Sequence, residues 1–364
     1  MIIPVHTKEN AYSVHLGDQV LQEFSHRNKD TLEKYDQIIV VTDENVWSRH
    51  EDYFASSFFL PYKVYIAPNG EACKTFESFF DVQSFLLKEG CSRNSALLAF
   101  GGGAIGDLTG FVAATFMRGI PFYQIPTTIL AHDSAVGGKT AINHPEGKNM
   151  IGAFYQPKEV IYDVHFLKTL PEKEVMSGMA EVIKHALISD KEWVEEFLQQ
   201  ESITNINEPK LLEWLAKGIK VKAHIVSLDE REGSLRKHLN FGHTYGHAVE
   251  ASVGYGKITH GEAVMIGIIP ALMLSEKHGH IEKGTAYHLF QWASRLGYDF
   301  TSILPISFEK IAEFMLKDKK TTYKELHFVL LETIGNPFMK KIEMEDVHRC
   351  DEELRKWVRG RMDD

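Results

Sequence analysis

Cysteine is scarce in this chain, and the few cysteines form no pattern. The 364 residues include only Cys73, Cys91 and Cys350, which are odd in number, widely spaced and in no metal-binding pair. A disulfide framework or a cysteine zinc site is therefore not expected. A reduced, cytoplasmic setting fits this usage best.

Long apolar runs and an excess of positive charge are also missing. No uninterrupted apolar stretch approaches the roughly 18 residues of a transmembrane helix. Residues 1–6 lead straight into a strand-like pattern rather than a secretory signal. The formal net charge of −10 argues against nucleic acid or an anionic membrane as the main partner. A soluble globular protein with a small-molecule partner is the expectation that remains.

The chain length and a change in the hydrophobic pattern along the chain predict two domains. A chain of 364 residues is too long for a single ordinary core. Residues 1–170 contain near-continuous apolar runs, typical of strands buried on both faces of a parallel sheet. These runs are 38–42, 63–67, 96–100, 122–125 and 160–162. We expect an α/β domain here.

Residues 171–364 are predicted to be mainly α-helical, because helical periodicity dominates from Pro171 onward. The periodic segments are 172–189, 191–200, 208–228, 240–253, 260–278 and 284–297. A short strand is expected at 326–331. Two such halves are expected to pack with a cleft between them, where ligands often bind.

A glycine-rich turn follows the apolar run 96–100. Residues Gly101 to Asp107 have the Gly-x-Gly-x-x-Gly spacing, follow a strand and open a helix, which is the context this motif requires. Such glycines let a pyrophosphate approach backbone N–H groups at a helix N-terminus. A turn without a ligand is the alternative, and the acidic residue expected about 20 residues further on is absent. Asp43, at the end of an earlier strand, is available to hold a ribose instead.

Basic residues concentrate beside glycine-rich loops in an otherwise acidic chain. Lys139 and Lys148 lie in such loops rather than on solvated helix faces, and a lysine there suits phosphate as a point charge. Any one lysine, taken alone, is more simply a surface residue. Further cations in the helical half are Lys184, Lys222 and Arg236. If these cations converge, the ligand carries more than one negative charge.

Three histidines, His243, His247 and His260, lie among small and apolar neighbours. Imidazoles in such a setting need partners, and a shared divalent metal is one. His243 and His247 share one helix face, as in helical zinc sites; the alternative pairs His243 with His260 and leaves His247 as a catalytic group. Spacing alone does not decide between them. Glu181 shares a face with Lys184 and either pairs with that lysine or binds a cation.

Taken in order, these motifs resemble the 3-dehydroquinate synthase family. The resemblance covers nearly the whole chain, and its motifs are specific in order and spacing. The matching segments are 69–74, 101–107, 117–119, 126–128, 133–143, 147–149, 180–185, 239–250 and 260–263. The amino-acid sequence of residues 131–135 is similar to that of the Bacillus-type form of the family. The chain departs from the family pattern at two places. Asn69 stands where the family often has aspartate, and the segment before Asp133 is one residue shorter than in many relatives. Both departures affect local loop shape.

The resemblance implies a lyase of the shikimate pathway that depends on NAD and on zinc or cobalt. Its substrate would be 3-deoxy-D-arabino-heptulosonate 7-phosphate and its products 3-dehydroquinate and phosphate. The implied chemistry is transient oxidation by NAD, β-elimination of phosphate, reduction, and an intramolecular aldol closure. The implied architecture is a Rossmann-like NAD-binding α/β domain (1–170) and a mainly helical metal- and substrate-binding domain (171–364), in a cytoplasmic homodimer.

The same resemblance implies roles for individual residues. The metal ligands would be Glu181, His243 and His260. Substrate or catalytic positions would be Arg118, Asp133, Lys139, Asn149, Lys184, Lys222, Arg236, Asn240, His247 and one of Lys319 and Lys320. NAD positions would be Asp43, Asn45, Gly70, Glu71, Lys74, Gly102, Gly103, Ala104, Ile105, Gly106, Asp107, Thr127, Thr128, Lys139, Lys148, Phe166, Leu167, Lys168 and Thr169.

Three other functions compete with this one. A metal-dependent polyol or glycerol dehydrogenase shares the two-domain plan but needs no set of phosphate-binding lysines. Another sugar-phosphate cyclase would differ only by a small change in the pocket. An inactive nucleotide-binding regulator would not require an open metal site. Accumulation of NADH from a simple polyol, without phosphate release, would establish the dehydrogenase.

Overall fold

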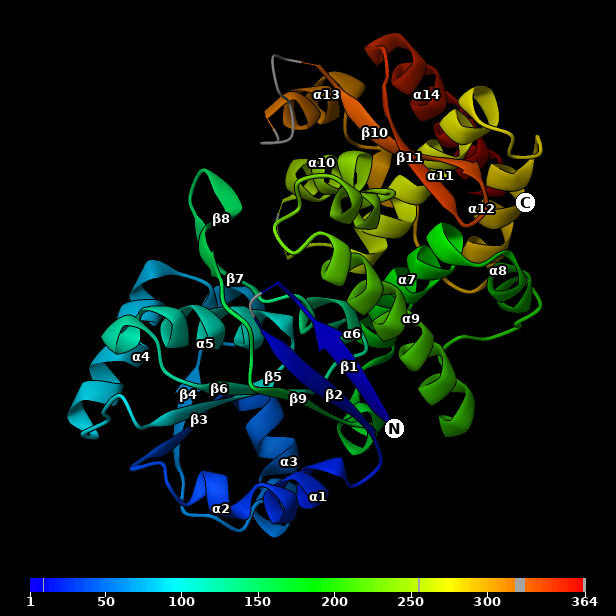
Figure 1. Ribbon diagram of the computed structural model, residues 1–364. Coiled ribbons are helices and arrows are strands. Elements are labelled where there is room, and N and C mark those ends of the chain that lie inside the picture. The colour runs from blue at the N-terminus through cyan, green and yellow to red at the C-terminus, as the bar shows by residue number, and fades with distance from the viewer. Residues whose placement is uncertain (9, 255, 318–324, 363–364) are drawn as a thin grey trace. The chain divides into compact units, whose positions relative to one another are not determined.

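A computed structural model describes residues 1–8, 10–254, 256–317 and 325–362. Its contacts divide the chain into two compact units (Figure 1). Unit 1 comprises Met1–Pro171 with Glu208–Arg231, and unit 2 comprises Glu172–Asn207 with Glu232–Asp364. Lys319 and Lys320, assigned above to the substrate, lie outside the described residues. Among the helices that are described, none is both long and apolar enough to cross a membrane.

Unit 1 is built on a seven-stranded sheet with the order β1-β2-β9-β6-β5-β3-β4 (Figure 1). β1 and β2 are antiparallel, and every other neighbouring pair is parallel. The strands are β1 Ile2–His6, β2 Ala11–Gly17, β3 Ile38–Asp43, β4 Lys63–Ala67, β5 Ala96–Gly101, β6 Phe122–Pro126 and β9 Glu159–Asp163. The five predicted apolar runs are β3, β4, β5, β6 and β9, which confirms the predicted α/β fold class.

Helices cover both faces of this sheet, which is why its central strands are mostly apolar. Ile39 and Val41 of β3 point into one core cluster, whereas Ile38 and Val40 point into another. This alternation follows from the two-residue period of a strand. One face is covered by α4 (Phe76–Lys88) and α5 (Gly103–Thr115), and the other by α1 (Val20–Arg27) and α3 (Glu44–Ser57). Short turns are α2 Lys29–Leu32, η1 Gly70–Cys73, η2 Phe116–Arg118, α6 Ala131–Ser134 and η3 Val164–Thr169.

The strand order reverses between β3 and β5, and this fixes where a ligand can bind. β4 lies on one side of β3, while β5 and β6 extend in the other direction. Ile38 pairs with Ala96, so the continued register brings Asp43 level with Gly101. Open α/β sheets bind ligands at such a reversal, outside the carboxyl ends of the strands. Asp43 and the glycine turn are therefore neighbours.

A hairpin and one late helix complete unit 1. The hairpin is β7 (Lys139–His144) and β8 (Gly147–Phe154). The late helix, α9 (Glu208–Leu228), contacts β1, β2 and α6. The sequence placed α9 in the second domain because it follows residue 171. Its contacts place it in unit 1, because its buried apolar residues pack on the β1–β2 end of the sheet.

Unit 2 is mainly helical and is built around α11 (His260–His278), which is buried along most of its length. Around it lie α7 Glu172–Ser189, α8 Lys191–Leu198, α10 His243–Val253, α12 Thr285–Arg295, α13 Phe308–Lys317 and α14 Met344–Met362. The remaining elements are the 3₁₀ turns η4 Leu235–Asn240 and η5 Thr301–Ile303 and the hairpin of β10 His327–Thr333 and β11 Asn336–Lys341. The predicted helices are confirmed.

The start of α10 differs from the expectation. The periodicity predicted a helix from residue 240, whereas α10 begins at His243. Gly242 has a φ of 79°, a left-handed conformation that a continuous right-handed helix does not contain. This break lets His243 open a new helix.

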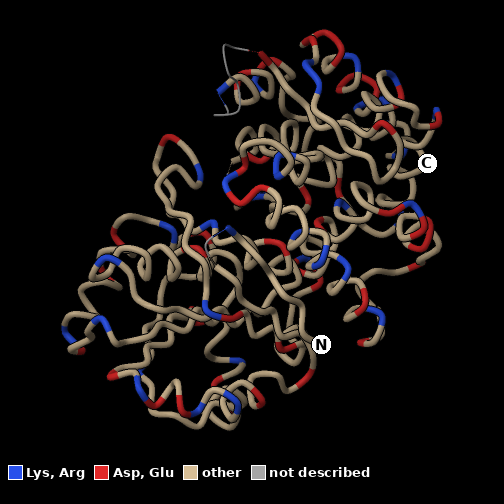
Figure 2. The backbone as a smooth tube through the Cα atoms, viewed as in Figure 1, with Lys and Arg blue, Asp and Glu red and all other residues tan. Residues whose placement is uncertain are grey.

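Figure 2 shows acidic and basic residues interspersed along the helices of both units rather than gathered in one basic stretch.

Candidate active site

Three side chains of unit 2 converge on one point: Glu181 of α7, His243 at the start of α10 and His260 at the start of α11. Glu181 Oε1 lies 3.4 Å from Nε2 of His243 and 3.4 Å from Nε2 of His260. The carboxylate is only 1% exposed. A buried carboxylate facing two imidazoles is a donor set suited to a divalent metal.

The spacing of these atoms supports that interpretation quantitatively. Two ligand atoms about 2.1 Å from a tetrahedral zinc are about 3.4 Å apart. Both contacts of Glu181 Oε1 have this length. Nδ1 of His243 lies 3.1 Å from the Phe241 carbonyl, so donation to that carbonyl leaves the Nε2 lone pair facing Glu181. The observed geometry therefore needs little rearrangement to hold a metal.

Glu250 is a residue of this cluster that the sequence analysis did not assign. Its Oε2 lies 3.3 Å from Nδ1 of His260, and its side chain is 3% exposed. Burial lowers the pKa of His260, but the contacts with Glu181 and Glu250 outweigh it and raise the pKa to about 9. Glu250 follows His243 by seven residues and His247 by three, so their shared helix face was the signal available in the sequence.

His247 also borders the cluster. Its ring centroid is 4.9 Å from that of His243 and 5.4 Å from that of His260, and nitrogen atoms of the three rings lie within 4.8 Å of one another. Glu181 Oε1 is 3.4 Å from Nε2 of both His243 and His260. All three imidazoles are therefore close enough to serve one metal, and the choice of ligand pair stays a prediction.

The other predicted residues of unit 2 are cationic or amide groups. Lys184 Nζ forms an ion pair with Glu181 Oε2, so one carboxylate oxygen faces the lysine and the other faces the histidines. Arg236 and Asn240 both belong to the 3₁₀ turn η4. Arg236 is buried, and Asn240 Nδ2 donates to Glu232 Oε1 over 2.8 Å.

Glycines allow the three helices to approach closely enough for this convergence. A Cβ added to Gly261 would lie 1.9 Å from the carbonyl oxygen of Ser177 on α7. A Cβ added to Gly267 would lie 1.9 Å from the carbonyl oxygen of Gly242, at the start of α10. Larger residues at these positions would therefore push α11 away from α7 and α10. Motif spacing did not reveal this requirement.

The glycine turn of unit 1 has the roles expected of a phosphate loop. Gly102 is the N-cap of α5, whose first turn carries no acidic residue, so the positive end of the helix dipole favours an anion. A Cβ added to Gly103 would meet the Ser134 hydroxyl at 2.8 Å, and one added to Gly106 would meet Gln124 at 2.9 Å. Gly106 thus permits close packing of α5 on β6, and Ala104 and Ile105 continue the same first turn.

Asp43 caps the neighbouring helix at the sheet edge. Its Oδ1 accepts the Val46 N–H over 3.1 Å, and burial raises the pKa of its carboxyl. The Asn45 N–H donates to Asn69 Oδ1 over 3.2 Å, so the asparagine that departs from the family pattern still organises this loop. Gly70 follows with a φ of 59°. These loops meet where the strand order reverses.

The turns after β6 and β9 are held by one backbone hydrogen bond and by hydrogen bonds from side chains. The Thr127 N–H donates to the Gly101 carbonyl over 3.1 Å, and the Tyr162 hydroxyl donates to the Thr128 carbonyl over 2.5 Å. Thr169 Oγ1 lies 2.8 Å from His50 Nε2.

The predicted positions in η3 differ in exposure. The side chains of Phe166 and Leu167 are buried, and Phe166 is part of the core. A cofactor contact at Phe166 would therefore come from its backbone. Lys168 is exposed and pairs with Asp18 at 3.7 Å and with Glu208 at 3.5 Å.

A buried lysine links the nucleotide loops to the hairpin. Lys74 is 2% exposed, and its Nζ lies 2.6 Å from Asp107 Oδ2 and 2.5 Å from Asn149 Oδ1. Burial lowers the pKa of Lys74, but the facing carboxylate of Asp107 outweighs it and raises the pKa. Lys148, beside Asn149, lies 4.0 Å from Glu71 Oε2. A charged ammonium therefore ties three segments together.

The remaining predicted residues of unit 1 are Asp133, Lys222, Lys139 and Arg118. Asp133 and the buried Lys222 form an ion pair at 3.0 Å. Lys139 is exposed at the start of β7. Arg118 is also exposed, and its φ of 70° is an unusual left-handed conformation for a non-glycine residue.

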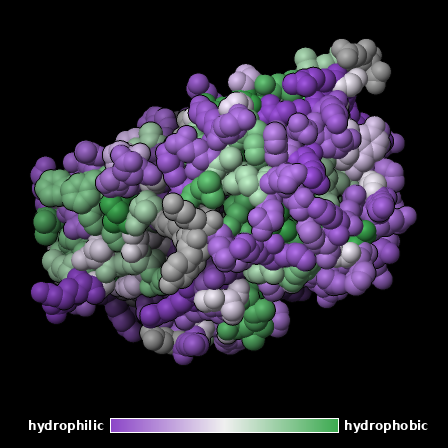
Figure 3. Space-filling model, turned by 90° about the horizontal axis from the view of Figure 1, so that it is seen from above, coloured by the Kyte–Doolittle hydropathy of each residue, from purple (hydrophilic) through white to green (hydrophobic). Residues whose placement is uncertain are grey.

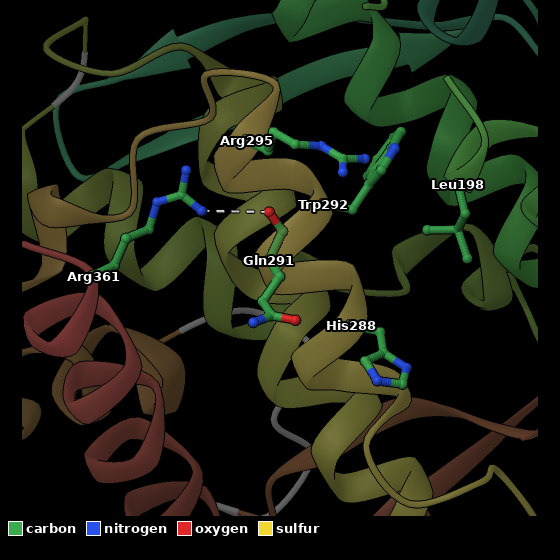
Figure 4. A pocket seen from close by; sticks show the side chains of 6 residues that line it. All are labelled: Leu198, His288, Gln291, Trp292, Arg295 and Arg361. Carbon is green, nitrogen blue, oxygen red and sulfur yellow. Dashed lines mark hydrogen bonds between the residues drawn. The ribbon is translucent and has the colours of Figure 1, made fainter. Parts of the chain in front are cut away.

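A pocket of about 550 Å³ in unit 2 is separate from these residues (Figure 4). It lies beside α12, and Arg361 from α14 donates to the Gln291 carbonyl at its edge. Its lining is Leu198, His288, Gln291, Trp292, Arg295 and Arg361. None of these is a predicted site residue, and we assign the pocket no part in the chemistry.

Comparison with known proteins decides the family. The model described as "3-dehydroquinate synthase N-terminal" matches residues 64–177, and "3-dehydroquinate synthase C-terminal" matches 178–321. The chain is 55% identical to a 3-dehydroquinate synthase of Lysinibacillus sphaericus, with 98% of each chain covered. The chain belongs to the 3-dehydroquinate synthase family. It is also 49% identical to the enzyme of that name from Listeria monocytogenes over 94% of each chain, and 44% identical to that of Bacillus mycoides.

Solved structures similar to this family member include two kinds of protein. A 2-deoxy-scyllo-inosose synthase, complexed with carbaglucose-6-phosphate, NAD+ and Co2+, has a TM-score of 0.83 and 27% identity, with 97% of this chain and 99% of that chain covered. A probable glycerol dehydrogenase from Sinorhizobium meliloti has a TM-score of 0.67 and 11% identity, covering 95% of this chain and 97% of that one, and shows the shared fold alone. The expected membership of the 3-dehydroquinate synthase family is confirmed.

Proposed function

We propose that this family member converts 3-deoxy-D-arabino-heptulosonate 7-phosphate to 3-dehydroquinate and phosphate, with NAD and one divalent metal as cofactors. The observation that carries the proposal is the pair of 3.4 Å contacts from Glu181 Oε1 to His243 and His260. It stands beside 55% identity to a named 3-dehydroquinate synthase. A metal held by Glu181, His243 and His260 would supply Lewis acidity toward a substrate hydroxyl, and NAD bound in unit 1 would supply a reversible hydride acceptor.

The metal ligands in this proposal are Glu181, His243 and His260. Three protein ligands leave coordination positions open, as in catalytic rather than structural zinc sites. Lys184 offsets the buried charge of Glu181 and keeps its Oε1 directed at the histidines. His247 is left to bind substrate or to move a proton.

Zinc content tests this ligand assignment. His260→Ala should lose bound zinc, whereas His247→Ala should keep zinc and turn over slowly. Loss of zinc from His247→Ala with zinc retained in His260→Ala would show that His243 and His247 form the ligand pair, and equal loss in both purified variants would contradict the assignment of His247 as a non-ligand.

NAD would bind in unit 1, where the strand order reverses. Backbone N–H groups at the N-terminus of α5 would donate hydrogen bonds to its pyrophosphate, and the Asp43 carboxylate would accept a hydrogen bond from a ribose hydroxyl. The other NAD contacts are proposed at Asn45, Gly70, Glu71, Lys74, Asp107, Thr127, Thr128, Lys139, Lys148 and 166–169. Apart from Lys139 and Lys148 on the β7–β8 hairpin, these residues follow the carboxyl ends of the parallel strands, which supports the proposal.

The substrate carries a phosphate and a carboxylate, and the predicted cations suit both groups. We propose substrate-binding roles for residues in each unit. From unit 1 these are Arg118, Asp133, Lys139, Asn149 and Lys222, and from unit 2 Lys184, Arg236, Asn240 and His247. The role of Lys319 or Lys320 stays a prediction from the family resemblance. The two units would thus be an NAD-binding and a metal-binding part of one enzyme.

The decisive experiment follows phosphate and dehydroquinate together. The purified protein with NAD, zinc or cobalt, and the heptulosonate phosphate should release one phosphate per dehydroquinate, without net NADH. No phosphate release under these conditions would refute the proposal. Accumulation of NADH from glycerol would indicate a dehydrogenase, and turnover of glucose 6-phosphate would indicate another cyclase.

We also propose that the protein forms a homodimer through unit 1. Phe76, Phe80 and Leu87 on α4 are at least 60% exposed, and Figure 3 shows apolar surface gathered over unit 1 at the left of the view. Within the described residues β8 pairs only with β7, and Met150 and Phe154 on it are exposed. An edge strand whose single charged residue is Lys148 can pair with another chain, and a two-fold axis makes such a contact self-complementary.

Light scattering tests the dimer. The measured mass should be about twice the chain mass of 41.4 kDa. Phe80→Glu should shift it toward the monomer, while Leu228→Glu, an equally exposed apolar residue at the end of α9, should not. A monomeric wild type would exclude the dimer.

We propose a cytoplasmic location, which the three free cysteines support.

A further inference from the structure

Asn143 lies where the β7–β8 hairpin departs from regular pairing. The register steps from Ile142 opposite Ile151 to His144 opposite Gly147, so one residue of β7 faces three of β8. Asn149 is one of these three, and its φ of 55° is left-handed. Asparagine tolerates this conformation better than most residues, and bulges of this kind re-aim a side chain.

Three hydrogen bonds fix Asn143 in this irregular stretch. Its Oδ1 accepts the Asn149 N–H over 2.9 Å, and its Nδ2 donates to Glu71 Oε2 over 2.9 Å. Its own N–H donates to the Lys74 carbonyl over 2.8 Å. The orientation of the amide is settled by its partners, because a backbone N–H only donates and an ionised carboxylate only accepts.

The same reasoning orients Asn149. The Lys74 ammonium can only donate, so the group facing it at 2.5 Å is Oδ1. The amide NH2 of Asn149 therefore points away from Lys74, as a donor. Lys74 itself is buried, and its ion pair with Asp107 at 2.6 Å holds it in place. Its contact with Oδ1 therefore fixes the orientation of the Asn149 amide.

We propose that Asn143 is a positioning residue for the reaction. It holds Asn149 in the left-handed conformation that presents the amide NH2 to a phosphate or carboxylate oxygen of the substrate. It also joins this donor to Glu71 and Lys74, the segment that contributes to the proposed NAD site, in one hydrogen-bonded unit. This inference rests on the proposed role of Asn149 in substrate binding.

A double-mutant cycle tests it. Asn143→Ala should lower kcat/KM for the heptulosonate phosphate about 10- to 100-fold, because small displacements of a positioned group have effects of this size. Asn143→Ala combined with Asn149→Ala should be no slower than Asn149→Ala alone, because Asn143 acts through Asn149. Losses that multiply would overturn the inference, as would kcat/KM of Asn143→Ala within about twofold of wild type.

Further variants separate positioning from stability. Asn143→Asp keeps the acceptor for Asn149 but sets a carboxylate against Glu71, and adding Glu71→Gln restores a donor and acceptor pair. The double variant should recover part of the lost kcat/KM, whereas no recovery would count against the geometry. Asn336→Ala is the matched control, since this asparagine bonds to Thr333 in the other hairpin, and it should keep full activity.

The outcomes also distinguish this inference from the proposed site. Full activity of Asn149→Ala would remove the substrate role of Asn149 and the inference with it. An impaired Asn149→Ala beside a fully active Asn143→Ala would overturn the inference alone. The thermal midpoint should change little in Asn143→Ala, and NAD affinity, measured by quenching of protein fluorescence, should fall by much less than kcat/KM, because only the Glu71 contact is lost there. A drop in both that accounts for the lost activity would show a purely structural role.

Discussion

One added methyl group at Gly261 should abolish metal binding. In Gly261→Ala the new Cβ would lie 1.9 Å from the Ser177 carbonyl oxygen and 2.5 Å from the carbonyl carbon. Both are backbone atoms of α7, so the clash cannot be relieved by turning a side chain. Ordinary contact starts at 3.4 Å, so α11 must move away from α7 by about 1.5 Å.

This displacement acts directly on the proposed ligands. His260 precedes Gly261, and Glu181 lies one helical turn after Ser177. A movement of about 1.5 Å along the line between Glu181 Oε1 and His260 Nε2 would widen their 3.4 Å separation to about 4.9 Å. One metal with bonds of about 2.1 Å spans at most about 4.2 Å between two ligand atoms. One ligand would therefore be lost.

The expected result is a zinc affinity more than about 100-fold weaker, since changes outside the ligand shell alone cost 10- to 100-fold. Competition with a fluorescent zinc chelator measures this affinity without requiring activity. Overpacking should also lower the free energy of unfolding by about 1–3 kcal/mol, measured by urea titration. Gly360→Ala is the matched control, because nothing lies within 4 Å of its added Cβ on α14. A folded Gly261→Ala protein with wild-type zinc affinity would refute the reasoning.

Three further predictions concern buried polar groups. Glu250→Gln should weaken zinc binding about 10- to 100-fold in the same chelator assay, because it removes the carboxylate that orients His260; an unchanged affinity would exclude that role. Asp351→Ala should lower the free energy of unfolding by about 3–5 kcal/mol, because it leaves Arg355 of α14 without its buried partner and removes the acceptor of the Tyr245 hydroxyl; a loss below about 1 kcal/mol in urea would contradict this. Burial lowers the pKa of His50 from 6.5 in the folded state. As the pH falls, His50 is therefore protonated in the unfolded state before it is protonated in the folded state, and the free energy of unfolding should fall as the pH drops below 6.5. His50→Gln should lose stability less steeply between pH 7.5 and 5.5, and equal slopes in urea titrations would exclude this contribution.

The strongly periodic parts of the fold could be predicted from the sequence. The apolar run 96–100 predicted β5, and the long periodic segments predicted α7 and α11. Such predictions succeed because burial of a strand or of a helix requires apolar residues at a spacing typical of that element. The sequence pattern did not reveal that α9 belongs to unit 1, because the face on which a helix packs depends on surfaces distant in the chain. The hairpin of β7 and β8 was missed as well, since β7 has three consecutive buried residues and β8 is largely exposed, so neither shows the alternation of a half-buried strand.

The order and spacing of the motifs revealed the glycine turn and the candidate ligands, and their resemblance to the 3-dehydroquinate synthase family implied the family. They left the metal pair ambiguous, because His243 and His247 share a helix face whether or not both bind an ion. Only the tertiary structure put Glu181 Oε1 at 3.4 Å from both His243 and His260, and only it brought Glu250 to His260. The physical reason is that these contacts join separate helices, and their distances depend on backbone packing at Gly261 that no local pattern encodes.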